Sequence, residues 1–94
     1  MADLEFEWDE AKNRTNVAKH GIGFAVARHV FKDAFAIEHL DDRLDYGEDR
    51  YIITGMVEDR LLTVIYTMRG DVVRIISARG ASPSEKHQYH EENR

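Results

Sequence analysis

The stretch RYIITGMVEDRLLTVIYTMRGDVVRIISAR, residues 50–79, decides the fold of this chain. Within it lie three runs rich in β-branched and aromatic residues, at 50–57, 61–69 and 72–79. Such runs are typical of β-strands. Gly70 and Asp71 separate the last two runs, and a Gly-Asp pair in that place is a hairpin signal. The stretch therefore predicts three consecutive antiparallel strands.

The segment LEFEW, residues 4–8, alternates apolar and acidic side chains, which predicts a half-buried strand with Trp8 directed inward. Asp9 then has the residue type of a helix N-cap, and the residues from 10 to 21 predict a helix that ends at Gly21. Its small side chains predict a narrow packing stripe made of Ala11, Thr15 and Ala18.

Residues 23–34 predict a second helix, because Phe24, Ala27 and Phe31 recur at helical spacing. A short strand is expected at 35–40, followed by the polar connection 41–50.

After the strands, Ser82, Pro83 and Glu85 form the pattern Ser-Pro-x-Glu, a capping box with proline in its preferred place. A last helix is expected to begin there. The predicted order is β-α-α-β-β-β-β-α over a single domain, residues 1–94. Helices packed on a mainly antiparallel sheet make this the α+β class.

The composition limits the classes of function that this chain is expected to have. The formal net charge of -5 argues against direct DNA binding, because non-specific affinity comes mostly from neutralising phosphates. There is no cysteine, which excludes disulfides and thiolate chemistry and makes a cytoplasmic location the expectation. We see no signal peptide and no apolar run as long as the roughly 20 residues of a membrane span, so no membrane association is predicted.

Two arginines flank the predicted hairpin turn. If the loop has two residues, Arg69 pairs with Val72 and Thr67 pairs with Arg74, so both arginines lie on one face of the sheet. The opposite, more apolar face is expected to form the core, with Met68 among its residues. The two arginines could hold phosphates, or they could be solvated and paired with acidic neighbours.

The junction between the last strand and the last helix offers a second candidate. Strict alternation places Arg79 on the other side of the pleat from Arg69. There it faces a helix start, which favours an anion. The competing interpretation is that Arg79 pairs with Glu85 and that Glu85 only caps the helix.

Histidines supply the remaining candidates. A histidine titrates near neutral pH, so His20 could act as general acid or base, with Lys19 holding a phosphate. The competing interpretation is that both cations complement the helix dipole. His87 and His90 share a helical face, but no third strong ligand accompanies them, so no metal site is predicted.

Two segments together resemble BrnT-type toxins: FEWDEAKNRTNVAKHGIGFAVARHVFKD at 6–33 and RIISARGASPSEKHQY at 74–89. The first resembles the opening motif of that family at Trp8, Asp9, Lys12, Asn16, Lys19, His20, Gly21 and Phe24. The second resembles the closing motif at Arg74, Ile75, Ile76, Ser77, Arg79, Ala81, Ser82, Glu85 and Tyr89. The resemblance spans nearly the whole chain.

The resemblance implies a RelE-like fold and a ribonuclease toxin of a type II toxin–antitoxin pair, which cleaves RNA and halts translation. It also implies a hetero-oligomer with a BrnA-like antitoxin, whose ribbon-helix-helix region binds the operator DNA. No cofactor is implied, and cleavage without a metal is expected.

Such cleavage needs a base, an acid and cations for the charge on the phosphate. Under this resemblance the catalytic candidates are Lys19, His20, Arg79 and Glu85, and the RNA-binding candidates are Lys12, Arg69 and Arg74. The acidic balance supports an alternative: a toxin-fold interaction module with little activity that binds its ribbon-helix-helix partner and acts in operon autoregulation.

Overall fold

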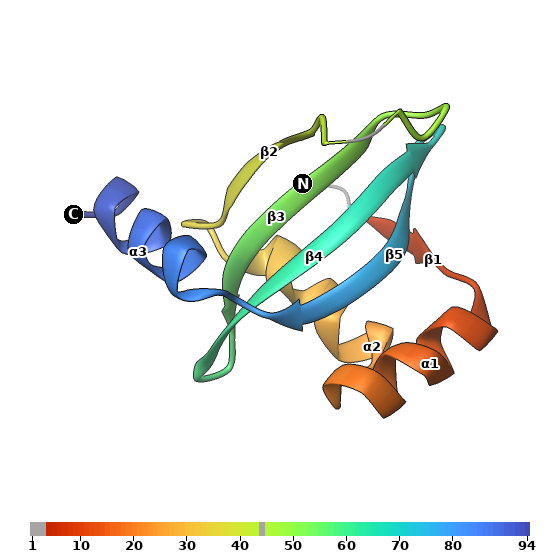
Figure 1. The fold of residues 1–94 in the computed structure, drawn as a ribbon, viewed down its shortest axis with the longest axis horizontal. Coiled ribbons are helices and arrows are strands. Elements are labelled where there is room, and N and C mark those ends of the chain that lie inside the picture. The colour runs from red at the N-terminus through yellow and green to blue at the C-terminus, as the bar shows by residue number, and fades with distance from the viewer. Residues whose placement is uncertain (1–3, 44) are drawn as a thin grey trace.

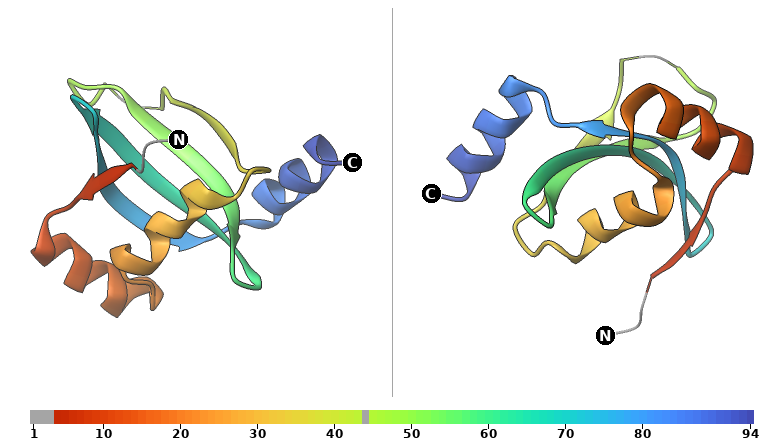
Figure 2. Two further views of the ribbon diagram at one scale, coloured as in Figure 1. Left: turned by 180° about the vertical axis from the view of Figure 1, so that it is seen from behind. Right: turned by 90° about the horizontal axis from the view of Figure 1, so that it is seen from below.

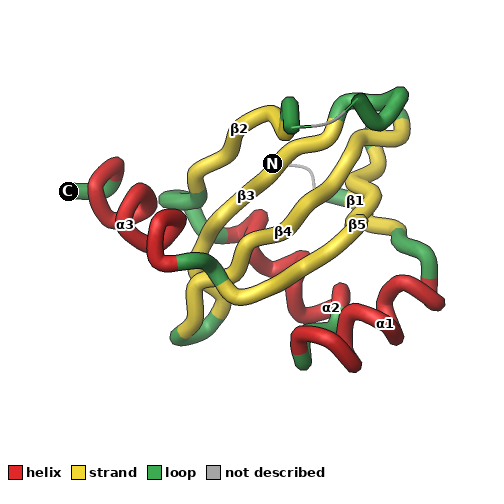
Figure 3. The backbone as a smooth tube through the Cα atoms, in the orientation of Figure 1, coloured by secondary structure: helices red, strands yellow, loops and turns green. Residues whose placement is uncertain are grey.

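The chain forms one five-stranded sheet with the order β1-β5-β4-β3-β2 (Figures 1 and 3). The computed structural model describes residues 4–43 and 45–94. The elements are β1 (Glu5–Glu7), α1 (Glu10–His20), α2 (Phe24–Ala27), the 3-10 helix η1 (Arg28–Lys32), β2 (Ile37–Asp41), β3 (Arg50–Val57), β4 (Arg60–Arg69), β5 (Val72–Gly80) and α3 (Pro83–Glu92). The predicted α+β order is confirmed. β1 pairs parallel to β5, whereas the other pairs are antiparallel.

The hydrophobic core lies on one face of the sheet, beneath α2 and η1 (Figure 2). The side chains that face it from the sheet include Leu62, Val64 and Tyr66 of β4 and Val73 and Ile75 of β5, as the alternation predicts. Trp8 packs edge-on against Phe24, which is fully buried. Met68 was expected in this core, but it is 42% exposed because it lies near the hairpin end, beyond the reach of the helices.

Two helical predictions need correction. The second helix is shorter than predicted: it is one turn of α-helix followed by the 3-10 turn η1, and it ends at Lys32. In α1 the predicted stripe of Ala11, Thr15 and Ala18 is exposed, and the buried residue of the helix is Asn16. Small side chains indicated the wrong face of this helix, because α1 packs through the hydrogen-bonding amide of Asn16.

The hairpin of β4 and β5 contains a β-bulge. Near its turn the register is as predicted, with Arg69 opposite Val72 and Thr67 opposite Arg74. Between Tyr66 and Ile65 the register shifts, because Tyr66 lies opposite Ile75 whereas Ile65 lies opposite Ser77. One residue, Ile76, is therefore extra, and every later side chain of β5 changes face relative to strict alternation.

The last helix, α3, extends from one end of the sheet (Figure 1). Its capping box is confirmed: Ser82 Oγ accepts from Glu85 N at 3.1 Å, and Ser82 N donates to Glu85 Oε1 at 2.8 Å. Farther along, Tyr89 is buried and donates its hydroxyl to Asp33 at 2.7 Å. Among the described residues, no helix is long and apolar enough to cross a membrane.

Candidate functional site

The face of the sheet that turns away from α2 and η1, called the open face below, carries the candidate arginines. Thr63, Thr67 and Arg69 project from β4 on this face, because their neighbours Leu62, Val64 and Tyr66 project into the core. The register then places their β5 partners there too, and the pairs are Thr63 with Arg79, Thr67 with Arg74 and Arg69 with Val72.

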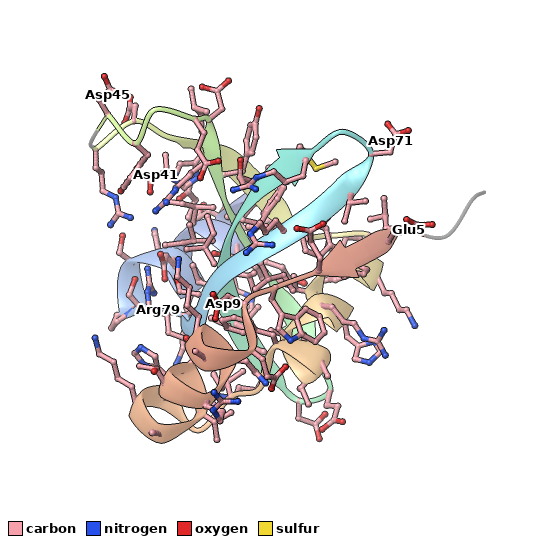
Figure 4. All side chains as sticks on the ribbon, turned by 90° about the vertical axis from the view of Figure 1, so that its right-hand side faces the viewer. Glu5, Asp9, Asp41, Asp45, Asp71 and Arg79 are labelled. Atoms are coloured by element: carbon pink, nitrogen blue, oxygen red, sulfur yellow. The ribbon has the colours of Figure 1, made fainter. Side chains whose placement is uncertain are left out.

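The prediction that Arg79 lies on the other side of the pleat from Arg69 is wrong. The extra residue Ile76 moves Arg79 onto the open face, the same face as Arg74. Figure 4 shows Arg79 on the same side of the sheet as Asp41 and Asp45, which belong to β2 and to the connection after it. The open face thus collects charges from both halves of the chain.

Arg79 is held by Glu85 in a bidentate ion pair. Nη1 lies 2.7 Å from Oε1 and Nη2 lies 2.9 Å from Oε2. Glu85 also accepts from Thr63 Oγ1 at 3.0 Å, and Thr63 Oγ1 in turn lies 2.8 Å from Thr54 Oγ1. The carboxylate therefore caps α3 and holds the guanidinium at the same time. These are the contacts that the competing interpretation of this junction predicted.

These contacts change the acidity of Glu85. The hydrogen bonds from Arg79, together with those from Ser82 N and Thr63, outweigh the opposing effect of burial and lower the pKa of Glu85 to about 2. A carboxylate with so low a pKa is a weak base, because general base catalysis works best with a pKa near the working pH. The geometry thus favours Glu85 as a holder of Arg79, while its role in proton transfer stays a prediction.

The ion pair leaves part of Arg79 available. A guanidinium has five N–H groups. Within the described residues, Nη1 donates to Gly80 O at 3.3 Å and to Glu85, and Nη2 donates to Glu85. The side of the guanidinium formed by Nε and Nη2 can still bind a phosphate oxygen pair in the bidentate geometry that arginine prefers. The side chain of Arg79 is 33% exposed, so solvent reaches it.

The other two predicted RNA-binding arginines also have acidic neighbours. Arg74 pairs with Glu7 of β1 at 2.5 Å, and its side chain is 29% exposed. Arg69 lies 3.5 Å from Glu48 and is 54% exposed, a long and solvated contact. Arg74 is therefore held on the open face by its ion pair. Arg69, at the end of the hairpin, is held only weakly.

Three candidates lie on α1. Lys12 and Lys19 are exposed, and His20 is partly buried in the last turn of the helix. Lys12, Asn16 and Lys19 are four and three positions apart, so they lie along one side of the helix. Asn16 contacts Ala78, the residue before Arg79, and thereby brings this side of α1 to the strand that carries the arginines.

Sequence reasoning missed two charged residues of the open face. Arg43, in the connection after β2, makes a bidentate pair with Asp41 at 2.8 and 2.9 Å, and this pair lowers the pKa of Asp41 to about 2. Arg50 of β3 stacks on Tyr46 with its Cζ atom 4.1 Å from the ring centre. No spacing pattern in the sequence indicated either, because both depend on how the connection between β2 and β3 folds back.

Metal ligands do not gather in the described part of the chain: no group of three or more His, Asp or Glu side chains is arranged to hold an ion there. His87 instead lies 3.9 Å from Glu91, one turn farther along α3.

A family model for "Ribonuclease toxin, BrnT, of type II toxin-antitoxin system" matches residues 8–85. The chain belongs to the BrnT family. The matched region runs from Trp8, which packs on α2, to Glu85, which holds Arg79, so it contains every candidate site residue and all the motif positions except Tyr89. Membership makes this chain a ribonuclease toxin of a type II system, and such a toxin has a cognate antitoxin as its partner. A search of curated proteins finds no match.

Proposed function

We propose that this BrnT-family chain cleaves RNA on the open face without a metal ion. In such a reaction the ribose 2′-oxygen attacks the neighbouring phosphorus, and the bond from phosphorus to the 5′-oxygen breaks. A base takes the proton of the 2′-hydroxyl, an acid gives a proton to the leaving 5′-oxygen, and cations stabilise the charge on the phosphoryl oxygens.

The observation that carries this proposal is the placement of Arg79. Its guanidinium is half-buried and held by Glu85. Within the described residues, Nε donates to no group and Nη2 donates to Glu85 alone. A fixed donor pair of this kind suits the developing charge of a phosphorane, because it needs no reorganisation during the reaction. Arg74, farther along the same face, would hold a neighbouring phosphate.

The cations of α1 complete the site in this proposal. His20 would carry a proton, because the ring nitrogens of an imidazole can both accept and donate one. Lys19 and Lys12, which lie on the side of α1 that meets β5, would contact the RNA backbone. We assign no single base, and Glu85 serves mainly to hold Arg79.

We further propose a cellular effect and a partner for this chain, as the family suggests. Cleavage in the cytoplasm would stop translation, and a BrnA-like antitoxin with a ribbon-helix-helix region would neutralise the toxin in a hetero-oligomer. Operator DNA would then be contacted only through the antitoxin, because the net charge of -5 disfavours direct binding by this chain.

One observation supports the alternative of a weakly active interaction module. The arginines of the open face have carboxylates of the same chain as partners: Arg43 with Asp41, Arg74 with Glu7, Arg79 with Glu85, and Arg50 and Arg69 with Glu48. These pairs reduce the positive potential that would attract RNA. In this alternative the chain mainly binds its partner.

The deciding experiment measures cleavage of a labelled single-stranded oligoribonucleotide by the purified chain, with and without EDTA. The variant is Arg79→Ala, and the matched control is Arg28→Ala, which removes the same charge from an exposed position at the start of η1, on the other side of the sheet. We expect wild type and control to cleave equally in both buffers, and Arg79→Ala to be slower by about 100-fold or more. A folded wild type that binds its antitoxin but leaves RNA intact would favour the alternative, and loss of cleavage in EDTA would contradict metal independence.

A further inference from the structure

Asn16 is a buried polar residue on a helix whose other side chains are mostly exposed. The residue is 6% exposed. The amide nitrogen donates to Ala78 O and to Ile22 O, both at 2.8 Å, and the amide oxygen accepts from Ala78 N at 3.1 Å. One side chain thus satisfies both backbone groups of Ala78, the residue directly before Arg79.

The position of this contact on β5 explains why it stabilises the strand. The parallel pairing of β1 with β5 covers Val72, Val73 and Arg74, and it ends there. Among the described residues, no strand lies beside the rest of the outer edge of β5. An unpaired buried backbone group costs about 1–3 kcal/mol. Asn16 takes the place of the missing strand at Ala78, which is fully buried.

The contact also follows the bulge at Ile76. A bulge leaves one residue unpaired and bends its strand locally, and the pairing with β4 resumes at Ser77. Asn16 holds the opposite edge of β5 two residues after the bulge and one residue before Arg79. Its own helix carries Lys19 and His20 three and four positions farther on. The amide is therefore the direct link between the two groups of candidate residues.

We infer that Asn16 is a positioning residue of the ribonuclease site, which sets the place of Arg79 relative to the end of α1. This inference rests on the proposed function and deepens it. Asn16 does not touch the RNA. It acts through the backbone of Ala78, so its loss displaces Arg79 without removing any charge from the open face.

A matched control lies on the same helix. Asn13 is also an asparagine that bonds the backbone: its Oδ1 accepts from Phe24 N at 2.8 Å, and its amide nitrogen donates to Glu10. Asn13→Ala removes the contact to α2 and the contact to Glu10 within α1, and it leaves the contacts to β5 unchanged. Asn16→Ala removes the contacts to β5. Asn16→Ser, whose hydroxyl can still bond one backbone group, is the milder variant if alanine prevents folding.

The experiment measures kcat and KM for oligoribonucleotide cleavage at a temperature where circular dichroism shows every variant folded. We expect Asn16→Ala to lower kcat by about 100-fold, the size of effect that a misplacement of about 1 Å produces, with KM nearly unchanged. Asn13→Ala should lower thermal stability but keep its kcat. Equal kcat for the two variants would overturn the inference.

A double-mutant comparison separates positioning from general damage. If Asn16 acts through Arg79, the pair Asn16→Ala with Arg79→Ala should cleave no more slowly than Arg79→Ala alone. Additive losses in kcat would show that Asn16 acts elsewhere and would contradict the inference.

A measurement without RNA keeps this inference distinct from the proposed function. The Arg79 Nε–H resonance should shift or broaden in Asn16→Ala and stay unchanged in Asn13→Ala. If the wild type fails to cleave RNA, the proposed function fails, and this resonance still decides whether Asn16 positions Arg79. An unchanged resonance in Asn16→Ala would refute the positioning.

Discussion

Arg74 and Arg79 lie on the same face of β5 although five positions separate them, an odd spacing that strict alternation would place on opposite faces. The extra residue Ile76 removes the conflict. Along the paired strand β4, their partners Thr67 and Thr63 are separated by roughly 14 Å at about 3.4 Å per residue. That distance suits two phosphates of one RNA strand better than a single phosphate, so the two arginines have different tasks.

We therefore expect Arg74→Ala to weaken RNA binding more than it slows the chemical step. KM should rise by about tenfold with kcat nearly unchanged, because a phosphate contact away from the reacting bond binds substrate and transition state alike. The salt dependence of binding should become shallower by about 0.7 in logarithmic slope. Arg69→Ala is the comparison: because Arg69 is 54% exposed, its KM should change by less than about threefold. A fall in kcat for Arg74→Ala would contradict this division.

Deleting Ile76 tests the bulge itself. Because this residue is the extra one, its removal should leave Arg79 opposite Thr63 and should keep the ion pair with Glu85. We expect a folded protein that is less stable by about 1–2 kcal/mol, from the lost burial of one half-buried isoleucine. Urea unfolding measures the loss. If the strand were regular, the deletion would turn Arg79 to the core face, and the protein would lose far more stability.

The pH dependence of stability should report the ion pair of Glu85. Its folded pKa of about 2 lies below its ordinary value of 4.5, so the pair stabilises the fold fully above pH 4.5 and loses this effect as the pH falls toward 2. Glu85→Gln should be less stable than wild type by about 2 kcal/mol at neutral pH. The difference should shrink between pH 4.5 and about 2. Asp41 titrates in the same range, but it is present in both proteins and cancels. A difference independent of pH would refute the assignment.

Gly55 stands where β3 passes η1 and the start of β2. A Cβ atom there would lie 2.9 Å from Val30 Cγ2, 3.0 Å from Ala36 Cβ and 3.2 Å from Asp33 Oδ2. Gly55→Ala should therefore destabilise the fold by about 1–3 kcal/mol through overpacking. Gly23→Ala is the control, since its nearest neighbour would be Val17 Cγ2 at 3.7 Å, an ordinary contact. Thermal unfolding of the two variants compares them, and equal melting temperatures would argue against the close packing at Gly55.

The local elements of this chain could be predicted from its sequence. Asp9 and Gly21 bound α1, and the box of Ser82 and Glu85 begins α3, because caps and turns depend on neighbouring residues. The hairpin register at Arg69 and Val72 followed from the Gly-Asp turn for the same reason. The two motifs also indicated the family, which the match over residues 8–85 confirms.

The tertiary structure alone decided how the candidate site is assembled. Alternation assumes one residue per position, so it could not show that Ile76 is extra or that Arg79 changes face. The role of Asn16 depends on a partner 62 positions away, and its burial contradicts the usual exposure of asparagine. A local sequence pattern reflects interactions between residues that are close in the sequence. A backbone group left unpaired at a sheet edge is satisfied by whichever side chain the fold brings to it.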